Sequence, residues 1–200
     1  MIFSHLSEGI QIDKKIRIIT AAIKMFQTHG FEKTKISDIV KEAGVAQGTF
    51  YLYFRSKFSI MPAIAEVIVE KMITEVEQKV NTNLFSKDLE TLVEVVFNLT
   101  KKYRDILALI YAGLASSEHL KEWESIYTPY YSWMQDFLSR GIASGEVRDT
   151  IDTEYYAKLI LGLIESAAEQ VYLYDNHENE GIINKQKQEV LSFLASALKP

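Results

Sequence analysis

The chain of 200 residues contains no cysteine. It therefore has no disulfide framework, no thiolate nucleophile and no thiolate zinc site. A chain without cysteine fits a reducing compartment, and we expect a cytoplasmic protein. Hydrophobic residues make up 48% of the chain, which is enough for a sizeable core in one domain or in a small domain joined to a larger one.

Long uncharged stretches are also missing. The stretches without Asp, Glu, Lys or Arg are short, such as residues 106–117, and they fall well below the roughly 18 apolar residues of a membrane-spanning helix. At the N-terminus, Glu8 and Asp13 stand where the apolar part of a secretory signal would run. The sequence therefore predicts a soluble protein with no membrane partner and with a frayed N-terminal tail.

Motifs for catalysis and metal binding are scarce. The four histidines are scattered, without an H-E-x-x-H or Glu-x-x-His pattern, at His5, His29, His119 and His177. No G-x-G-x-x-G, P-loop or G-x-S-x-G motif occurs. The closest approach to a metal cluster is Glu118, His119 and Glu122, for which a solvated surface is the simpler explanation. We expect no catalytic residue, no metal site, no cofactor and no enzyme activity.

Strand signals are almost absent, because only GVAQGTFYLYF at residues 44–54 has a strand-like composition. A sheet needs partner strands, and none is found elsewhere, so this stretch is expected to be helical. Apolar spacing and turn residues predict an all-α fold with helices at 12–29, 36–43, 46–53, 57–80, 87–102, 104–115, 117–140, 152–174 and 184–198. Gly30 and Gly44 are expected to end the first two helices, and Ser56 to begin the fourth. Pro62 predicts a kink or restart near Met61.

The charge is distributed unevenly along the chain. Residues 1–60 contain nine Lys and Arg against five Asp and Glu, a net charge of +4. Residues 61–200 contain 13 against 22, a net charge of −9. A basic head on an acidic body suggests that only the head meets a polyanion.

The head has the pattern of a helix-turn-helix, in which two short helices are separated by a turn that contains Gly44. Alone, this pattern also fits ordinary helical packing. Its residues, however, resemble the N-terminal DNA-binding domain of the tetracycline-repressor (TetR) family over about residues 12–60. The resemblance rests on several short motifs in the same order as in the family. They are two alanines shortly before an apolar residue followed by Phe, the pair GF followed three residues later by Thr34, and the patterns I-x-x-I-x-x-x-A-G-V, G-T-F-Y-x-Y-F and SK.

The resemblance implies an N-terminal three-helix head at residues 1–56 and a helical ligand-binding and dimerisation body at residues 57–200. It implies base contacts in the major groove by Gln47, Gly48 and Tyr51, and phosphate contacts by Thr49, Tyr53 and Lys57. Gln47 can pair with adenine through two hydrogen bonds.

Thr34 and Lys35 precede the second helix, where side chains and amides bind phosphate. The alternatives are a helix cap for Thr34, a solvated side chain for Lys35, a neutral surface residue for Gln47 and a packing ring for Tyr51. Two departures from the family pattern, Phe58 after the SK pair and Pro62, put the orientation of the fourth helix in doubt.

The body is rich in aromatic residues with a polar group, which suit an apolar cavity that needs a few oriented hydrogen bonds. The candidate ligand-binding residues are Tyr103, Tyr111, Tyr127, Trp133 and Glu165. An ordinary aromatic core is the alternative for each ring. The family resemblance implies a small-molecule effector, for which a hydrophobic molecule is favoured.

In the family, the last two long helices of each protomer form the dimer interface, and a symmetric dimer predicts a near-palindromic double-stranded operator. The sequence therefore predicts a homodimeric, ligand-responsive regulator of transcription that acts as a repressor. The alternative is a helical small-molecule-binding protein or enzyme whose head is only structural.

Overall fold

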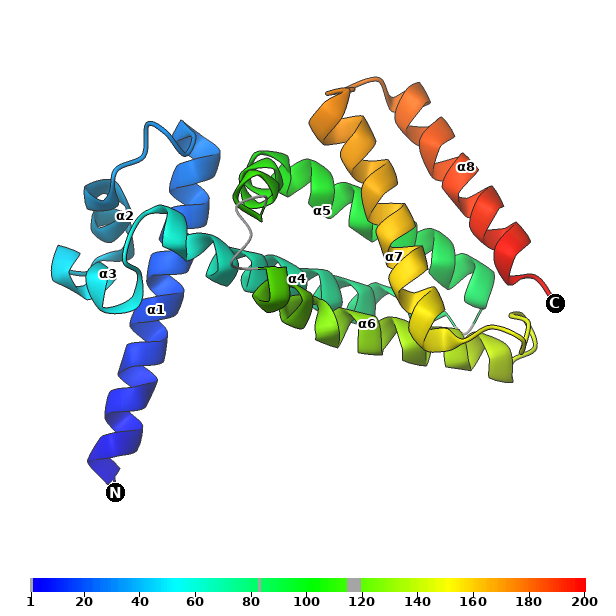
Figure 1. The fold of residues 1–200 in the computed structure, drawn as a ribbon, viewed down its shortest axis with the longest axis horizontal. Helices are drawn as coiled ribbons and strands as arrows, with labels where there is room; N and C mark the ends of the chain where they lie inside the picture. Colours follow the sequence, from blue (N-terminus) through cyan, green and yellow to red (C-terminus); the bar gives the residue numbers. More distant parts are fainter. Residues whose placement is uncertain (1, 83, 115–119) are drawn as a thin grey trace. The chain divides into compact units, whose positions relative to one another are not determined.

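A computed structural model of the chain describes residues 2–82, 84–114 and 120–200, with side chains for 13–82, 84–111 and 124–200. Within these ranges every regular element is helical, which confirms the all-α fold (Figure 1). The elements are α1 (Ile2–His29), α2 (Ile36–Ala43), α3 (Gln47–Tyr53), the 3-10 turn η1 (Phe58–Ile60), α4 (Met61–Lys79), α5 (Phe85–Leu114), α6 (Leu120–Ala143), α7 (Thr153–Glu169), the π-helical turn η2 (Gln170–Tyr174) and α8 (Glu180–Leu198).

The chain forms two compact units that are interleaved in sequence. The first unit contains residues 1–67 and 105–120, and the second contains residues 68–104 and 121–200. In the first unit, α2 and α3 pack beside α1 (Figure 1). In the second unit, α7 and α8 pack along each other (Figure 1). The expected boundary after residue 56 stays a prediction.

Several helix boundaries differ from the prediction, and three of the differences change an element. The expected helices 87–102 and 104–115 are one continuous helix, α5, because no glycine or proline interrupts the chain between them. The prediction of a frayed N-terminal tail was wrong, since α1 already begins at Ile2. The segment 152–174 is α-helical only to Glu169 and then widens into η2.

The start of α4 follows the predicted pattern. The Ser59 N–H donates to Ser56 Oγ at 3.1 Å, and the Ser56 N–H donates to Ser59 Oγ at 3.0 Å, which gives a reciprocal cap. One 3-10 turn follows, and the α-helix starts at Met61, which is the predicted restart. Pro62 is the second residue of α4, where the missing N–H breaks no helical hydrogen bond. Pro129, in contrast, lies inside α6 without ending the helix.

In the second unit, Arg148 anchors the end of α8. Arg148 Nε donates to the Ala197 carbonyl at 2.9 Å, and Arg148 Nη2 donates to Tyr156 Oη at 2.6 Å. A cation near a helix C-terminus complements the helix dipole. No described helix is long and apolar enough to cross a membrane.

Candidate functional site

The turn of the helix-turn-helix begins at Gly44, whose φ of +63° favours glycine. Arg17 on α1 secures this turn, because its Nη2 donates to the Ala43 carbonyl at 2.5 Å and to the Gly44 carbonyl at 3.1 Å. A Cβ on Gly44 would lie 2.8 Å from Arg17 Nη2. The C-terminus of α2 is thus held against α1, which fixes where α3 starts.

The helix α3 has one buried and one exposed face. Phe50 is 0% exposed and Phe54 is 5% exposed, and their ring centroids lie 5.5 Å apart. On the other side, Gln47 and Gly48 are exposed and Tyr51 is 52% exposed. The strand-like stretch is therefore helical, as expected, with its phenylalanines pointing inward and with Gln47 and Tyr51 outside.

Two further predicted DNA-contact residues on α3, Thr49 and Tyr53, are half-buried. The Thr49 N–H donates to the Ala46 carbonyl at 2.9 Å. The Tyr53 ring lies tilted against Phe54, with centroids 6.3 Å apart. These two side chains lie at the edges of the exposed face of α3.

Sequence reasoning missed Leu52, which is 78% exposed on α3. It follows Gly48 by four residues, so that these two residues share one strip of the helix, and Gln47 and Tyr51 share the neighbouring strip. A Cβ built on Gly48 meets nothing within 4 Å. The signal in the sequence was a leucine at the only variable position of G-T-F-Y-x-Y-F, on a face otherwise free of aliphatic side chains.

Thr34 does not face outward, although a phosphate contact was predicted for its side chain. It is 2% exposed, and its hydroxyl donates to the Gly30 carbonyl at 2.8 Å and the Met25 carbonyl at 3.2 Å. Thr34 therefore satisfies carbonyls at the end of α1. Lys35 precedes α2, with an exposed side chain and with its N–H donating to Asp38 Oδ2 at 2.9 Å.

Lys57 is half-buried and its ammonium group is already engaged. Its Nζ donates to the carbonyls of Phe31 at 2.5 Å, Thr34 at 2.9 Å and Glu32 at 3.4 Å. It also lies 4.2 Å from the centroid of the Phe31 ring. Lys57 thus connects the start of α4 to the loop between α1 and α2. The sequence had instead predicted a phosphate contact for this side chain.

Phe58, which departs from the family pattern, packs at the same place. Its ring meets Phe31 edge to face at 6.1 Å, and Phe31 meets Phe26 edge to face at 5.1 Å. The phenylalanine therefore extends an aromatic row under the ammonium group of Lys57.

We expect Lys57→Met to lower the free energy of unfolding by about 2 kcal/mol, because carbonyls bonded to a charged group lose their donor. DNA affinity falls, but the slope of log K against log salt stays unchanged. Loss of a phosphate contact would instead reduce this slope by about 0.9. Titrations of DNA at several salt concentrations distinguish the two roles, with Lys41→Met at an exposed position as the control. A smaller salt-dependence slope for Lys57→Met than for the wild type would show that Lys57 contacts a phosphate.

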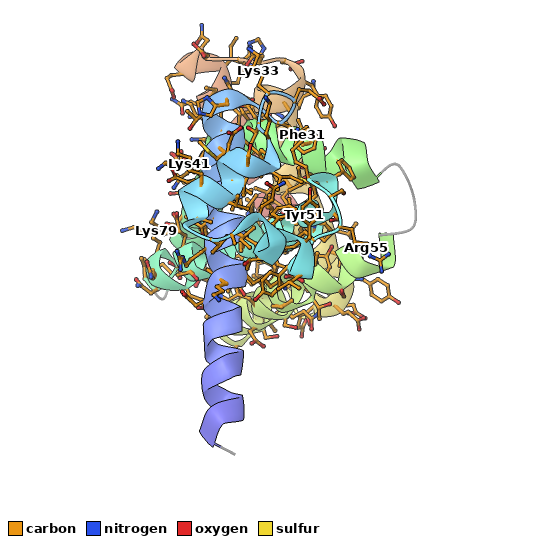
Figure 2. The ribbon with its side chains drawn as sticks, turned by 90° about the vertical axis from the view of Figure 1, so that its left-hand side faces the viewer. Phe31, Lys33, Lys41, Tyr51, Arg55 and Lys79 are labelled. Carbon is orange, nitrogen blue, oxygen red and sulfur yellow. The ribbon has the colours of Figure 1, made fainter. Side chains whose placement is uncertain are left out.

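Other cations of the first unit are available for long-range attraction. Lys33, Lys41 and Arg55 are exposed, and Lys41 and Arg55 lie on opposite sides of the α2–α3 face in Figure 2. Lys24, in contrast, forms an ion pair with Glu42. The face that presents Gln47 and Tyr51 is thus bordered by positive charge, which suits a polyanion.

The candidate ligand residues are distributed over both units. Tyr103 is 3% exposed and its hydroxyl accepts a hydrogen bond from Lys71 Nζ at 3.2 Å. Tyr127 is 7% exposed. Trp133 is half-buried and stacks on Phe137, with centroids 5.5 Å apart. Tyr111 belongs to the first unit, where it is half-buried.

A buried polar pair lies in the second unit. Tyr130 is 0% exposed, and neither its hydroxyl nor the buried Oε1 of Glu165 has a hydrogen-bond partner among the described residues. Burial, together with the charge of Glu169, raises the pKa of Glu165 to about 8. Burial, together with Glu165, also raises the pKa of Tyr130. Two polar side-chain atoms of the second unit are therefore buried without partners among the described residues, and one of them belongs to Glu165, the carboxyl group proposed from the sequence.

An apolar groove of about 640 Å³ lies between α7 and α8. Its lining includes Leu159, Gly162, Leu163, Ser166 and Phe193. Leu159 is 66% exposed and Phe193 is 63% exposed. Large aliphatic and aromatic side chains left outside in this way mark a surface for a protein partner.

The side chains of Glu118, His119 and Glu122, the nearest approach to a metal cluster in the sequence, lie outside the described residues. Among the side chains that are described, no group of three His, Asp or Glu is placed to hold a metal ion.

Two families match the chain. Residues 18–64 match the bacterial regulatory proteins of the tetR family, and residues 89–198 match the tetracyclin repressor-like C-terminal domain. The HTH-type transcriptional regulator YvdT of Bacillus subtilis is 38% identical over 184 residues, which cover 91% of this chain and 93% of YvdT. The fatty acid metabolism regulator protein of B. subtilis is 25% identical over 189 residues, which cover 93% and 92% of the two chains.

A solved structure has a similar fold. The transcriptional regulator FadR from B. subtilis in complex with stearoyl-CoA has a TM-score of 0.72 and 24% sequence identity, and the match covers 92% of this chain and 98% of FadR. This similarity extends through the head and the body, so both halves of the chain have counterparts in one regulator.

Proposed function

Because this chain belongs to the tetracycline-repressor family and is a ligand-responsive DNA-binding regulator, we propose that it represses transcription as a homodimer on a near-palindromic operator in the cytoplasm. A small hydrophobic molecule that binds in the body releases it from DNA. The exposed face of α3 carries this proposal, since it presents Gln47, Gly48, Tyr51 and Leu52 beside exposed cations. The named relatives are regulators, and we propose no catalysed reaction.

The test of this function is salt-dependent binding to the DNA upstream of its own gene or a neighbouring gene. The dimer should prefer this DNA over competitor DNA by roughly a thousandfold or more at physiological salt. Equal affinity for both, with and without candidate effectors, contradicts the regulator function.

On α3 we propose that Gln47 and Tyr51 form a polar strip against base edges, and that Gly48 and Leu52 form an apolar strip. Thr49, Tyr53 and Lys35 flank both strips and contact phosphates. The glycine lets the backbone approach a base, and an aliphatic side chain suits the methyl group of thymine. Thr34 and Lys57 stabilise the DNA-binding unit through hydrogen bonds to backbone carbonyls inside it.

Replacing Gln47 by alanine should relax specificity at one or two base pairs, at a cost of about 1–3 kcal/mol in binding. The preferred duplex is first selected from a random DNA library, and each base pair is then varied for both proteins. Lys41→Gln serves as the control, because losing a general cation weakens all sequences alike. A uniform loss in Gln47→Ala would show that its side chain contacts no base.

Leu52 can be tested by removing methyl groups from the DNA. Each thymine of the selected duplex is replaced by deoxyuridine, which lacks only the methyl group. We expect one or two positions at which this change weakens the wild-type protein several-fold but leaves Leu52→Ala unaffected, because the contact is already lost. Equal losses for both proteins at every position would exclude a methyl contact by Leu52.

We further propose that α7 and α8 form the dimer interface through the groove that Leu159 and Phe193 border. Its apolar lining suits a self-complementary contact around a two-fold axis. Leu159→Glu should convert the dimer to monomers in sedimentation analysis, since charges facing each other across the axis repel. Leu84→Glu, at another exposed leucine of the second unit, should leave the dimer intact. A dimeric Leu159→Glu protein would place the interface elsewhere.

For the effector, the aromatic content of the body supports a hydrophobic molecule. The FadR structure contains stearoyl-CoA, so long-chain acyl-CoA is the first candidate to add to the DNA-binding assay. An effector must bind the DNA-free conformation more tightly than the DNA-bound one. We expect the protein to leave DNA at the effector concentration that saturates the binding site in the body.

A further inference from the structure

A pocket of about 320 Å³ lies in the second unit, where side chains from the end of α4, the start of α5 and the end of α6 line it. Its volume is at the lower end of the range for small-molecule sites, roughly 300–1,000 Å³, so it suits a compact ligand. It is separate from the groove between α7 and α8, because the two linings share no residue. No step of the proposed function uses this pocket.

Two aromatic rings form an apolar wall of the pocket. Phe85 of α5 and Phe137 of α6 are buried, and their rings stack with centroids 4.6 Å apart and planes at 19°. A Cβ on Gly141, one turn after Phe137, would lie 2.6 Å from Phe85 Cδ2, so α5 and α6 approach closely here. Tight packing therefore fixes the position of this wall.

Arg140 adds a positive charge beside the wall. Its guanidinium carbon lies 5.8 Å from the centroid of the Phe137 ring, which is within the range of a cation–π contact. Among the described residues the guanidinium group forms neither a hydrogen bond nor an ion pair. The residue is exposed, and its N–H donors therefore remain available to a ligand.

Two carboxyl groups line the same pocket, and each is held through only one of its oxygens. Asp88 is 7% exposed, and its Oδ1 accepts from the Thr82 N–H at 3.0 Å and the Thr82 hydroxyl at 2.8 Å. Glu146 Oε1 accepts from the Phe85 N–H at 3.1 Å and the Ser144 hydroxyl at 3.2 Å. Within the described part of the chain no hydrogen bond engages Asp88 Oδ2 or Glu146 Oε2, so each carboxyl group retains an acceptor.

Opposite charges thus line one pocket without pairing. An arginine that reaches a carboxylate forms a strong, often two-pronged ion pair with it, and Arg140 forms none with Asp88 or Glu146. A simple anion would be repelled by the two carboxylates, and a simple cation would be repelled by the guanidinium group. A molecule that carries both charges gains from all three groups.

We propose that this pocket binds a free α-amino acid with an apolar side chain, as a second ligand in addition to the hydrophobic effector. The α-carboxylate accepts paired hydrogen bonds from Arg140, and the ammonium group donates to the open oxygens of Asp88 and Glu146. The apolar side chain packs on the wall formed by Phe85 and Phe137. This inference goes beyond the proposed function and does not depend on DNA binding.

The standard L-amino acids are first screened one at a time, at millimolar concentration, by the shift that each causes in the thermal unfolding of the full-length protein. We expect the largest shift from one with an apolar side chain. Calorimetric titration at pH 7 then compares this amino acid with the amine that lacks its carboxylate and with the acid that lacks its ammonium group. The amino acid should bind about tenfold or more tightly than either, because each counterpart loses charge-assisted hydrogen bonds.

Arg140→Gln and Glu146→Gln locate the site. Each should weaken the amino acid by about tenfold or more, since hydrogen bonds to a charged partner are lost. Arg140→Gln should not weaken the amine, and Glu146→Gln should not weaken the acid. The amide oxygen of Glu146→Gln still accepts from the Phe85 N–H, so this variant keeps its fold. Lys87→Gln is the matched control, because Lys87 is exposed beside Asp88 and does not line the pocket.

Four results would overturn the inference. They are binding of no amino acid, equal affinity for the amino acid and one of its singly charged counterparts, an affinity that Arg140→Gln leaves unchanged, and equal weakening by Arg140→Gln and Lys87→Gln. Thermal unfolding without ligand checks that each variant is folded, and Arg140→Gln alone decides the test if Glu146→Gln is unstable. Preference for the selected DNA duplex is measured separately, and the regulator function survives each of these results.

Discussion

Replacing Phe50 by alanine is expected to lower the free energy of unfolding of the DNA-binding unit by about 3–5 kcal/mol. Phe50 is 0% exposed, and its ring contacts those of Tyr51 and Phe54 at centroid distances of 5.6 Å and 5.5 Å. Removing the ring leaves a cavity between α3 and the helices it packs on. A loss of this size is comparable with the whole stability of a small domain, so DNA binding should also disappear.

The effect can be measured by urea unfolding followed by circular dichroism. Leu52→Ala is the matched control on the same helix. Because Leu52 is 78% exposed, its truncation should change the stability by no more than about 0.5 kcal/mol while it alters DNA selectivity. Equal destabilisation by the two substitutions would mean that α3 does not pack through Phe50.

Replacing Glu165 by glutamine is expected to increase stability at alkaline pH. The pKa of Glu165 is raised to about 8 in the folded protein, mainly because burial disfavours its charged form and also because Glu169 is near. The unfolded chain has an ordinary glutamate, with a pKa of about 4.3. Between these two values the folded state binds the additional proton, so the stability of the wild type falls as the pH rises.

The slope that Glu165 contributes is at most about 1.4 kcal/mol per pH unit. Because the residue as a whole is only half-buried, we expect a smaller slope and a total difference of about 2–3 kcal/mol between pH 5 and pH 8. Glutamine has no proton to lose, and its variant should therefore lack this part of the pH dependence. Other titrating groups cancel when the two proteins are compared.

Urea unfolding at pH 5, 6, 7 and 8 measures the difference. Glu154→Gln, at an exposed position, should follow the wild-type curve. If the Glu165→Gln and wild-type curves are parallel over this range, the carboxyl group of Glu165 is solvated in the folded protein and its pKa is not raised.

The head shows how far local sequence can predict structure. The helix-turn-helix, the glycine caps and the two faces of α3 follow from spacing and residue type, because each depends on neighbours within a few positions. The restart of the helix at Met61 follows from Pro62 in the same way. The single helix α5 was missed because a charged stretch around Tyr103 resembles a break but contains no residue that ends a helix.

The roles of Thr34 and Lys57 were beyond local reasoning. Both residue types bind phosphate when exposed, and both lie near a helix start. Their side chains instead bond to carbonyls outside their own helices. Thr34 donates to Gly30 and Met25 at the end of α1, and Lys57 donates to Phe31, which lies before α2. Whether a polar side chain turns inward depends on which acceptors the packed helices leave open, and spacing does not contain that information.

By itself, the sequence determined that this is an all-helical regulator with a DNA-binding head and an acidic body, because helical periodicity, charge and the motifs of α2 and α3 are properties of short segments. Only the tertiary structure decided which polar groups remain for partners. It turned Thr34 and Lys57 inward, left Leu52 outside, and buried the Tyr130 hydroxyl and the Glu165 Oε1 without partners among the described residues. These outcomes depend on burial and on contacts between distant segments, and both arise only when the helices pack.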